Sequence, residues 1–184
     1  MRLVIVGCGR VGAALAEAFD NGGHEVVVVD LSTRAFDRLS PEFKGQAVRG
    51  DGTDEDVLRK AGVEGADVLL ALTEGDNRNV MAAQVAMEKL SVGRSVAKIN
   101  DPVRAAAYAE LGIGTICRTT MLTDAVLGFL GLGPTGVPSV IAPVPHVHDE
   151  ADATAPGGAG AADGDGATGE AAGAAQVHAE SRRS

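Results

Sequence analysis

The stretch LVIVGCGRVG at residues 3–12 decides the fold, because it joins a short apolar run to a Gly-x-Gly-x-x-Gly motif. The motif alone is weak evidence, but here it directly follows a predicted strand and opens a predicted helix over Val11–Asn21. A second apolar run, Glu25–Asp30, ends in an acidic side chain about 20 residues after the motif. Strand, glycine loop, helix and acidic residue in this order predict a dinucleotide-binding unit of the Rossmann type.

Each glycine of the motif has a separate physical role. Gly7 permits a tight turn, Gly9 lets a phosphate approach the backbone, and Gly12 lets the helix pack closely on the sheet. The N-terminus of the helix presents unpaired N–H groups to an anion. Asp30 can accept hydrogen bonds from both ribose hydroxyls, and its charge would repel a 2′-phosphate. The motif therefore favours NAD(H) or an adenine nucleotide over NADP(H).

Strand and helix patterns alternate through residues 1–132. Six apolar runs with the character of buried strands lie at Arg2–Val6, Glu25–Asp30, Gln46–Arg49, Asp67–Leu72, Ser95–Ile99 and Ile113–Cys117. Helical patterns follow them at residues 11–21, 32–39, 53–61, 75–90, 101–110 and 122–130. This α/β alternation predicts a doubly wound, parallel six-stranded sheet with the Rossmann-like order 3-2-1-4-5-6 and helices on both faces.

Polar side chains are expected to start several of these helices. Ser32 is expected to cap the second helix, Thr53 or Asp54 the third, and the Asp101-Pro102 pair should begin the fifth. The last helix is apolar on more than one side. This pattern fits either packing in the core or contact with a second copy of the chain.

The composition changes after residue 132, where Gly and Pro residues break any helical pattern. From residue 149 onward the chain consists mainly of small and acidic residues, with too little apolar surface to offset the entropy of ordering. We therefore expect one domain at residues 1–132 and a disordered, low-complexity acidic Ala/Gly-rich tail at residues 133–184. His146 and His148 lie in this tail, and an i, i+2 pair in a flexible segment is rarely a metal site, so no metal is predicted.

The overall composition argues against several classes of protein. The formal net charge is −9 and no basic stripe is present, which argues against binding to nucleic acid or to an anionic membrane surface. No apolar run approaches the roughly 20 residues needed to cross a bilayer, so no direct membrane insertion is expected. The two cysteines, Cys8 and Cys117, form no Cys-x-x-Cys pair and are expected to be reduced thiols of a cytoplasmic protein.

Further candidate ligand-binding residues follow the third, fourth and fifth predicted strands. They are Asp51 and Gly52, Thr73 and Glu74, and Lys98. Doubly wound folds bind ligands at the carboxyl ends of their parallel strands, so these residues should share an edge with the glycine loop. Each of them alone could equally be a turn or capping residue, and Arg10 could be either a phosphate ligand or a solvated residue at the helix start.

Several short motifs follow one another along residues 1–130. They are Gly7–Gly12, Gly23–Val26, Asp30, Gly50–Thr53, Ala61–Val63, Ala66–Asp67, Thr73 with Asp76 and Asn79, and Asn100–Pro102. Taken together, this ordered set resembles the RCK N-terminal domain, also called the KTN or TrkA-N domain, of the Trk/Ktr regulators of potassium uptake.

The resemblance implies a regulatory subunit in the cytoplasm that binds NAD(H) or ATP/ADP and acts on a membrane potassium transporter subunit of the Trk/Ktr type. Such domains form homodimers and rings, alone or with a second RCK protein, at the inner face of the cell membrane, and nucleotide exchange changes the ring and so the pore. Carried over by position, the nucleotide-binding residues would be Gly7, Cys8, Gly9, Arg10, Val11 and Gly12 at the phosphates, Asp30 at the ribose, Asp51 and Gly52 at the adenine, and Thr73, Glu74 and Lys98 along the remainder.

Two departures from the family pattern affect how the activity of such a protein could be regulated by ligands. The place of the second, ligand-sensing domain of many members is taken here by the tail, which argues against control through such a domain. Residues 118–120 read Arg-Thr-Thr where some ATP-binding members carry an acidic, cation-linked residue, which argues against that cation site.

An enzymatic function is not expected. A dehydrogenase needs a catalytic acid or base beside the nicotinamide, and usually a substrate domain. The histidines lie in a turn (His24) or in the tail (His146, His148 and His178), and Tyr108 has no Tyr-x-x-x-Lys arrangement, so we predict no catalytic residue. An NAD-dependent oxidoreductase fragment or a Rossmann-type redox sensor remains the alternative, although a sensor that binds DNA would need a helix-turn-helix and a basic face.

Overall fold

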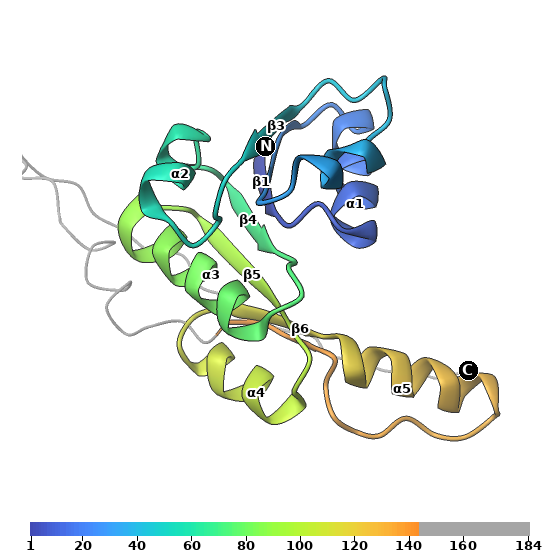
Figure 1. The fold of residues 1–184 in the computed structure, drawn as a ribbon. Helices are drawn as coiled ribbons and strands as arrows, with labels where there is room; N and C mark the ends of the chain where they lie inside the picture. The colour runs from blue at the N-terminus through green and yellow to red at the C-terminus, as the bar shows by residue number, and fades with distance from the viewer. Residues whose placement is uncertain (144–184) are drawn as a thin grey trace, which may run out of the picture.

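The computed structural model describes residues 1–143, and within them seven strands form one sheet in the order β3-β2-β1-β4-β5-β6-β7 (Figure 1). The strands are β1 Arg2–Val6, β2 Glu25–Asp30, β3 Gln46–Arg49, β4 Val68–Ala71, β5 Arg94–Ile99, β6 Gly114–Cys117 and β7 Val140–Ile141. Strands β1 to β6 are parallel, which confirms the predicted 3-2-1-4-5-6 order. Val6 at the end of β1 lies level with Val29 of β2 and Ala71 of β4, so the loops that follow these strands meet at one edge.

Helices cover both faces of the sheet (Figure 1). They are α1 Arg10–Asn21, the 3₁₀ helix η1 Thr33–Arg38, α2 Glu55–Lys60, α3 Asp76–Leu90, α4 Pro102–Glu110 and α5 Arg118–Phe129. Helices α1 and η1 pack on one face of β1 and β2, whereas α2 and α3 pack on the opposite face. Helix α4 joins α3 over β5 and β6. The layers therefore match a doubly wound α/β fold.

The four successive valines of β2 are buried on both sides of the sheet. Val26 and Val28 pack with α1, and Val27 and Val29 pack on the side of α2 and α3. All four side chains are at most 3% exposed. A strand that is covered on both faces needs an unbroken apolar run, so the structure confirms the role predicted for this run.

The second predicted helix, at residues 32–39, differs in type from the expectation. It is the short 3₁₀ helix η1, and the Ser32 side chain makes no capping hydrogen bond. The backbone N–H of Ser32 donates instead to Asp30 Oδ1 at 2.8 Å. Ala35 is the one buried residue of η1, and Phe36 and Leu39 are only partly buried against the same core cluster, so the segment has little apolar surface to hold a longer α-helix on the sheet.

Strand β7 was not predicted, and it extends the folded part of the chain beyond the predicted boundary at residue 132. It pairs antiparallel with β6, where Val140 lies opposite Ile116, and the Cys117 N–H donates to the Ser139 carbonyl at 2.7 Å. A strand of two residues carries no periodic pattern, which is why the sequence did not reveal it. The remainder of the predicted tail, residues 144–184, lies outside the described residues.

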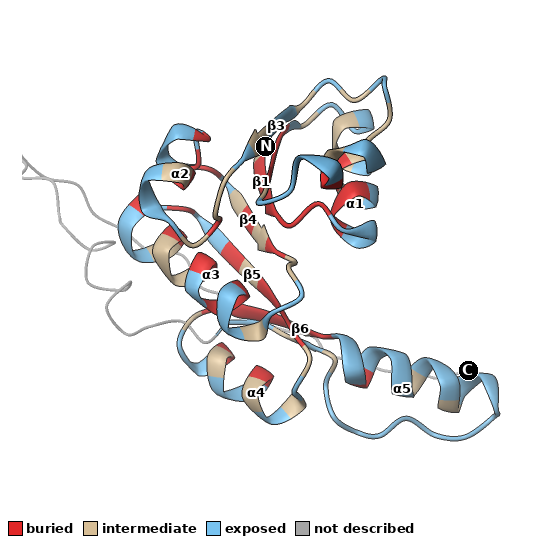
Figure 2. Cartoon of the chain, in the orientation of Figure 1, coloured by how far each residue is buried: buried red, intermediate tan, exposed pale blue. Residues whose placement is uncertain are grey.

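Helix α5 extends away from the edge of the sheet and is exposed over most of its length (Figures 1 and 2). Thr120 is its one buried residue, and Phe129 is 91% exposed. Of the two alternatives left open by the sequence, the structure therefore does not show packing in the core, and contact with a second copy stays a prediction. The segment after the helix returns toward the sheet, and Thr135 N and Oγ1 both donate to Asp124 Oδ1 at 2.8 Å. Within residues 1–143, no helix combines the length and apolar character needed to cross a membrane.

Two helices begin at predicted capping residues. Asp54 Oδ1 accepts hydrogen bonds from the backbone N–H groups of Asp56 at 2.8 Å and Val57 at 3.2 Å. Asp101 caps α4 in the same way, and Pro102 occupies its first turn. Each carboxylate satisfies N–H groups that have no partner within the helix.

Replacing Asp54 by Ala should lower the free energy of unfolding by about 1 kcal/mol, because two N–H groups of α2 lose their acceptor. Asp56→Ala removes the same charge from the same helix end but leaves the cap intact, and should cost at most about 0.5 kcal/mol. Urea unfolding followed by circular dichroism measures both values. Equal losses for the two variants would contradict the capping role.

Candidate functional site

The loop between β1 and α1 is shaped by two glycines that the fold itself requires. Gly7 has φ +106°, and a Cβ atom there would lie 3.0 Å from the backbone of Leu72 and Thr73. A Cβ atom on Gly12 would lie 2.0 Å from the carbonyl oxygen of Gly7. A side chain on Gly7 would strain its backbone and crowd the loop after β4, and one on Gly12 would require α1 to move away from the sheet.

Gly9 differs from these two, because nothing lies within 4 Å of the position its Cβ would take. Its backbone has an ordinary extended conformation at the N-cap of α1, with no side-chain cap and no acidic residue in the first turn of the helix. The open space therefore lies against the unpaired N–H groups and the partial positive charge of the helix start. A phosphate group fits this combination of space, donors and charge.

Asp30 ties the glycine loop to the end of β2. Its Oδ2 accepts the backbone N–H of Cys8 at 2.8 Å, and its Oδ1 accepts that of Ser32 at 2.8 Å. Each carboxylate oxygen can accept more than one hydrogen bond, so the group can still receive the hydroxyls of a ribose. The residue that the sequence assigns to ligand binding thus also holds the loop in place.

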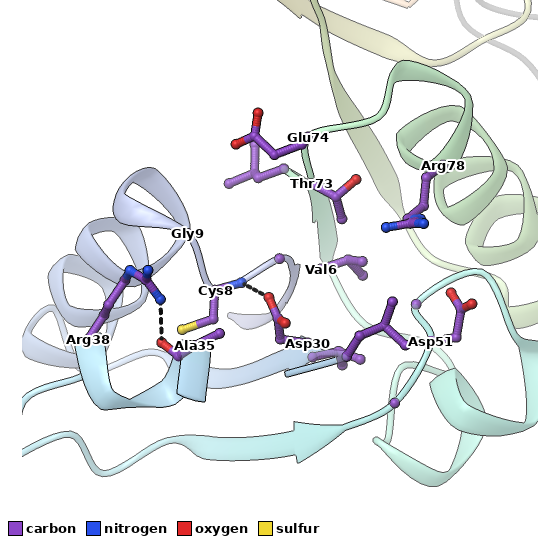
Figure 3. Close-up of a pocket in the computed structure, with 16 residues that line it drawn as sticks. Val6, Cys8, Gly9, Asp30, Ala35, Arg38, Asp51, Thr73, Glu74 and Arg78 are labelled. Carbon is purple, nitrogen blue, oxygen red and sulfur yellow. Dashed lines mark hydrogen bonds between the residues drawn. The ribbon is translucent and has the colours of Figure 1, made fainter. Parts of the chain in front are cut away.

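A cavity of about 340 Å³ opens at this edge of the sheet (Figure 3). Eight of the residues predicted for ligand binding line it: Gly7, Cys8, Gly9, Asp30, Asp51, Gly52, Thr73 and Glu74. The loops after β1, β2, β3 and β4 therefore meet around one space, as expected for the carboxyl edge of a parallel sheet.

Four predicted residues do not line the cavity. Arg10 and Val11 are exposed on the first turn of α1, and Gly12 is buried beneath that turn. Lys98 is only 9% exposed, and its Nζ lies 3.9 Å from Glu74 Oε1. Glu74 lines the cavity, whereas Lys98 does not.

Asp51 is held in a turn by Thr53. Its Oδ1 accepts from the Thr53 backbone N–H at 3.0 Å and from Thr53 Oγ1 at 2.8 Å, and these hydrogen bonds keep the pKa of Asp51 below its ordinary value. A Cβ atom on Gly52 would lie 2.2 Å from Val6 Cγ1, so the next residue must be glycine for the loop to reach the end of β1. Asp51 therefore serves the turn and remains ionised beside the cavity.

Asn79 holds Thr73 in place at the edge of the cavity through hydrogen bonds. This fully buried side chain accepts from Thr73 N at 2.8 Å and Thr73 Oγ1 at 2.6 Å. Its amide donates to the carbonyls of Thr73 at 3.0 Å and Lys98 at 2.8 Å. One side chain thus joins α3 to the ends of β4 and β5, which makes this wall of the cavity rigid.

Eight further residues that were not predicted for ligand binding also line the cavity. Among them are Leu31 directly after β2, Arg38 at the end of η1 and Arg78 in the first turns of α3. Leu31 could have been found, because it immediately follows a strand end. The two arginines lie inside helices, and the side of a helix that faces a cavity is set by packing.

Cys8 is not suited to act as a nucleophile. Its side chain is fully buried, and burial, together with the nearby charge of Asp30, raises the pKa of the thiol. The thiol form, which is a poor nucleophile and a poor metal ligand, is therefore favoured. Within residues 1–143, no group of three or more His, Cys, Asp or Glu side chains is arranged to hold a metal ion.

Comparison with known proteins assigns the family. Residues 3–119 match the TrkA-N domain. The chain belongs to the TrkA-N domain family. A relative, the Trk system potassium uptake protein TrkA of Streptomyces coelicolor, is 46% identical over 127 residues. That match covers 69% of this chain and 57% of the relative, so the chain spans less than two thirds of that protein's length.

Solved structures of TrkA-N and related domains share the fold. The Kef CTD of Shewanella denitrificans, in its AMP-bound form, has a TM-score of 0.59 at 21% identity, covering 71% of this chain and 82% of that chain. The GsuK channel bound to NAD has a TM-score of 0.58 at 20% identity, covering 69% of this chain and 23% of that chain. The match over residues 3–119 confirms the predicted resemblance to the TrkA-N domain.

Gly9→Ala should abolish or strongly weaken nucleotide binding while changing the free energy of unfolding by less than about 1 kcal/mol, because its Cβ fills ligand space and touches no protein atom. Gly12→Ala should instead destabilise the fold by about 2 kcal/mol or more, because its Cβ meets the Gly7 carbonyl. Urea unfolding and titration calorimetry separate the two effects. A Gly9→Ala protein that unfolds as easily as Gly12→Ala would show that position 9 is structural.

Proposed function

We propose that this chain is the nucleotide-binding regulatory subunit of a Trk/Ktr-type potassium uptake system, which binds NAD(H) or ATP/ADP and thereby controls a membrane potassium transporter subunit. The observation that carries the proposal is the open space at Gly9, bounded by the start of α1 and by Asp30. The name of the Streptomyces coelicolor relative, Trk system potassium uptake protein TrkA, supplies the physiological setting.

The residues of the site fit an adenine nucleotide. The N–H groups at the start of α1 would hold the phosphates, and Asp30 would accept the ribose hydroxyls, since its oxygens retain free lone pairs. Asp51, Gly52, Thr73 and Glu74 would line the remainder of the ligand. AMP in the Kef CTD and NAD in the GsuK channel share an adenosine 5′-phosphate, and this is the part that the cavity would recognise.

A regulatory role fits the site better than a catalytic one. The carboxylates of Asp30 and Asp51 are engaged by backbone and hydroxyl donors, and Cys8 is buried with a raised pKa. Glu74 lies 3.9 Å from Lys98 and 4.0 Å from Arg118, so its charge is partly balanced. We therefore favour a binding protein over an oxidoreductase fragment.

The proposed assembly uses helix α5. Its exposed apolar side chains, together with those just after it, would be covered in a homodimer or a ring of such domains, alone or with a second RCK protein. They are Leu122, Val126, Phe129, Leu130 and Leu132. We propose that this assembly lies in the cytoplasm and meets the membrane only through the transporter subunit.

Titration calorimetry of the purified chain with NAD, NADH, NADP, ATP and ADP tests the proposal. We expect micromolar or tighter binding of NAD(H) or of ATP and ADP, and weak binding of NADP, whose 2′-phosphate would approach the Asp30 carboxylate. The same protein incubated with NAD or NADH and alcohols, hydroxy acids or aldehydes should show no change in absorbance at the NADH band. Reproducible hydride transfer would replace the regulator with an oxidoreductase, and a chain that binds no nucleotide would refute the proposal.

Asp30→Ala should weaken nucleotide binding at least tenfold, because the ribose loses its acceptor and the glycine loop loses its tie to β2. Asp37→Ala is the matched control, since it removes an equal charge from an exposed position of η1 outside the cavity. Its affinity should equal that of the natural chain. Unchanged affinity in Asp30→Ala, with its circular dichroism spectrum retained, would mean that the ribose binds elsewhere.

A further inference from the structure

Arg78 projects a free guanidinium into the cavity (Figure 3). It lies in the first turns of α3, on the opposite side of the cavity from Cys8 and Arg38. In the part of the chain that the structure describes, its side chain takes part in no hydrogen bond to protein and lies within 4 Å of no carboxylate oxygen. Arg78 is exposed, so its planar group and its N–H donors are available to a ligand in the cavity.

Asp51 stands beside Arg78 at this end of the cavity (Figure 3). The two donors of Thr53 both engage Asp51 Oδ1, which leaves Oδ2 without a hydrogen-bond donor among residues 1–143. After these hydrogen bonds, the charge of Arg78 is a further reason that the pKa of Asp51 is lowered, which is consistent with their proximity. One ionised oxygen and one flat cation thus face the same volume.

The surroundings favour a planar, uncharged group over a phosphate at this end. Leu31 lines the same cavity and is 48% exposed, which is a large apolar surface for a residue in a cavity wall. A phosphate here would meet the negative charge of Asp51, whereas an aromatic ring can stack on a guanidinium plane and rest on a leucine side chain. A base with an exocyclic amine could also donate to the free Oδ2 atom.

Of the two purines, adenine fits this arrangement better. Adenine offers its N6 amine to a single acceptor, while guanine carries an acceptor oxygen at the corresponding position. Guanine presents two adjacent donors on its other side, which suit a carboxylate with both oxygens open, and Asp51 has only one. The single open oxygen therefore selects for the adenine amine.

We propose that Arg78 is a specificity-determining residue, whose guanidinium covers one face of an adenine ring while the ring's amine donates to Asp51 Oδ2. This inference rests on the proposed function, because it assumes a nucleotide whose phosphates lie at the glycine loop. The family resemblance already implies an adenine beside Asp51 and Gly52, and the proposal adds Arg78 as the residue that covers the ring. NADH, ATP and ADP then share one determinant, because the same ring is common to all three.

Calorimetric titration of AMP, ADP, ATP, NADH and GDP into four proteins tests this assignment: the natural chain, Arg78→Ala, Arg78→Lys and Arg34→Ala. The natural chain should prefer ADP to GDP by about tenfold or more, and Arg78→Ala should lose affinity for ADP and NADH alike, by about tenfold. Arg78→Lys keeps the charge but not the plane, and should be nearly as weak as Arg78→Ala. Arg34→Ala removes an equal charge from η1 outside the cavity and should bind normally.

Asp51→Asn tests the other half of the pair. Its amide can keep one oxygen toward Thr53 while placing an N–H₂ group where Oδ2 was, so the preference for ADP over GDP should shrink by about tenfold. Circular dichroism melts show whether each variant is folded. Unchanged ADP affinity in folded Arg78→Ala would overturn the assignment, as would a loss that grows from AMP to ADP to ATP, since that would make Arg78 a phosphate ligand. If the natural chain binds none of these nucleotides, it is the proposed function that fails.

Discussion

The close approach of α1 to β1 is the constraint on which the rest of the site depends. The carbonyl oxygen of Gly7 occupies the place that a side chain on residue 12 would take, 2.0 Å from its Cβ position. This contact sets the first turn of the helix directly over the end of the strand, with its free N–H groups toward the cavity. Asp30 then fastens Cys8 to the end of β2, so the loop is ordered before any ligand arrives.

Most of the fold follows from local patterns that are strong in this sequence. The buried valines of β2, the caps Asp54 and Asp101, and the alternation of strands with helices require no knowledge of distant contacts, and the structure has all of them. Strand β7 depends on where the chain returns after α5, and η1 depends on how little apolar surface it has to bury. Such features are decided by tertiary packing, which the sequence does not display.

The same division applies to the site. Residues that directly follow strand ends, such as Asp51 and Thr73, could be placed at the cavity because the edge of a parallel sheet gathers them. Lys98 lies next to the end of β5, yet it does not line the cavity. Arg38 and Arg78 offset the acidic side chains of the lining, but their directions follow from helix rotation. Sequence position locates an edge, whereas the orientation of each side chain on a helix emerges only from packing.

Gly9 has a consequence for how this family can diversify. Gly7 and Gly12 are tied to the fold, so their loss would be removed by selection for stability alone, whatever the ligand. Gly9 has no such protection, because its backbone is ordinary and its Cβ position is empty. Under the proposed function, a single methyl group at this position would leave a stable scaffold that no longer binds a nucleotide. A gene duplicate could then become a purely structural partner through one substitution at position 9.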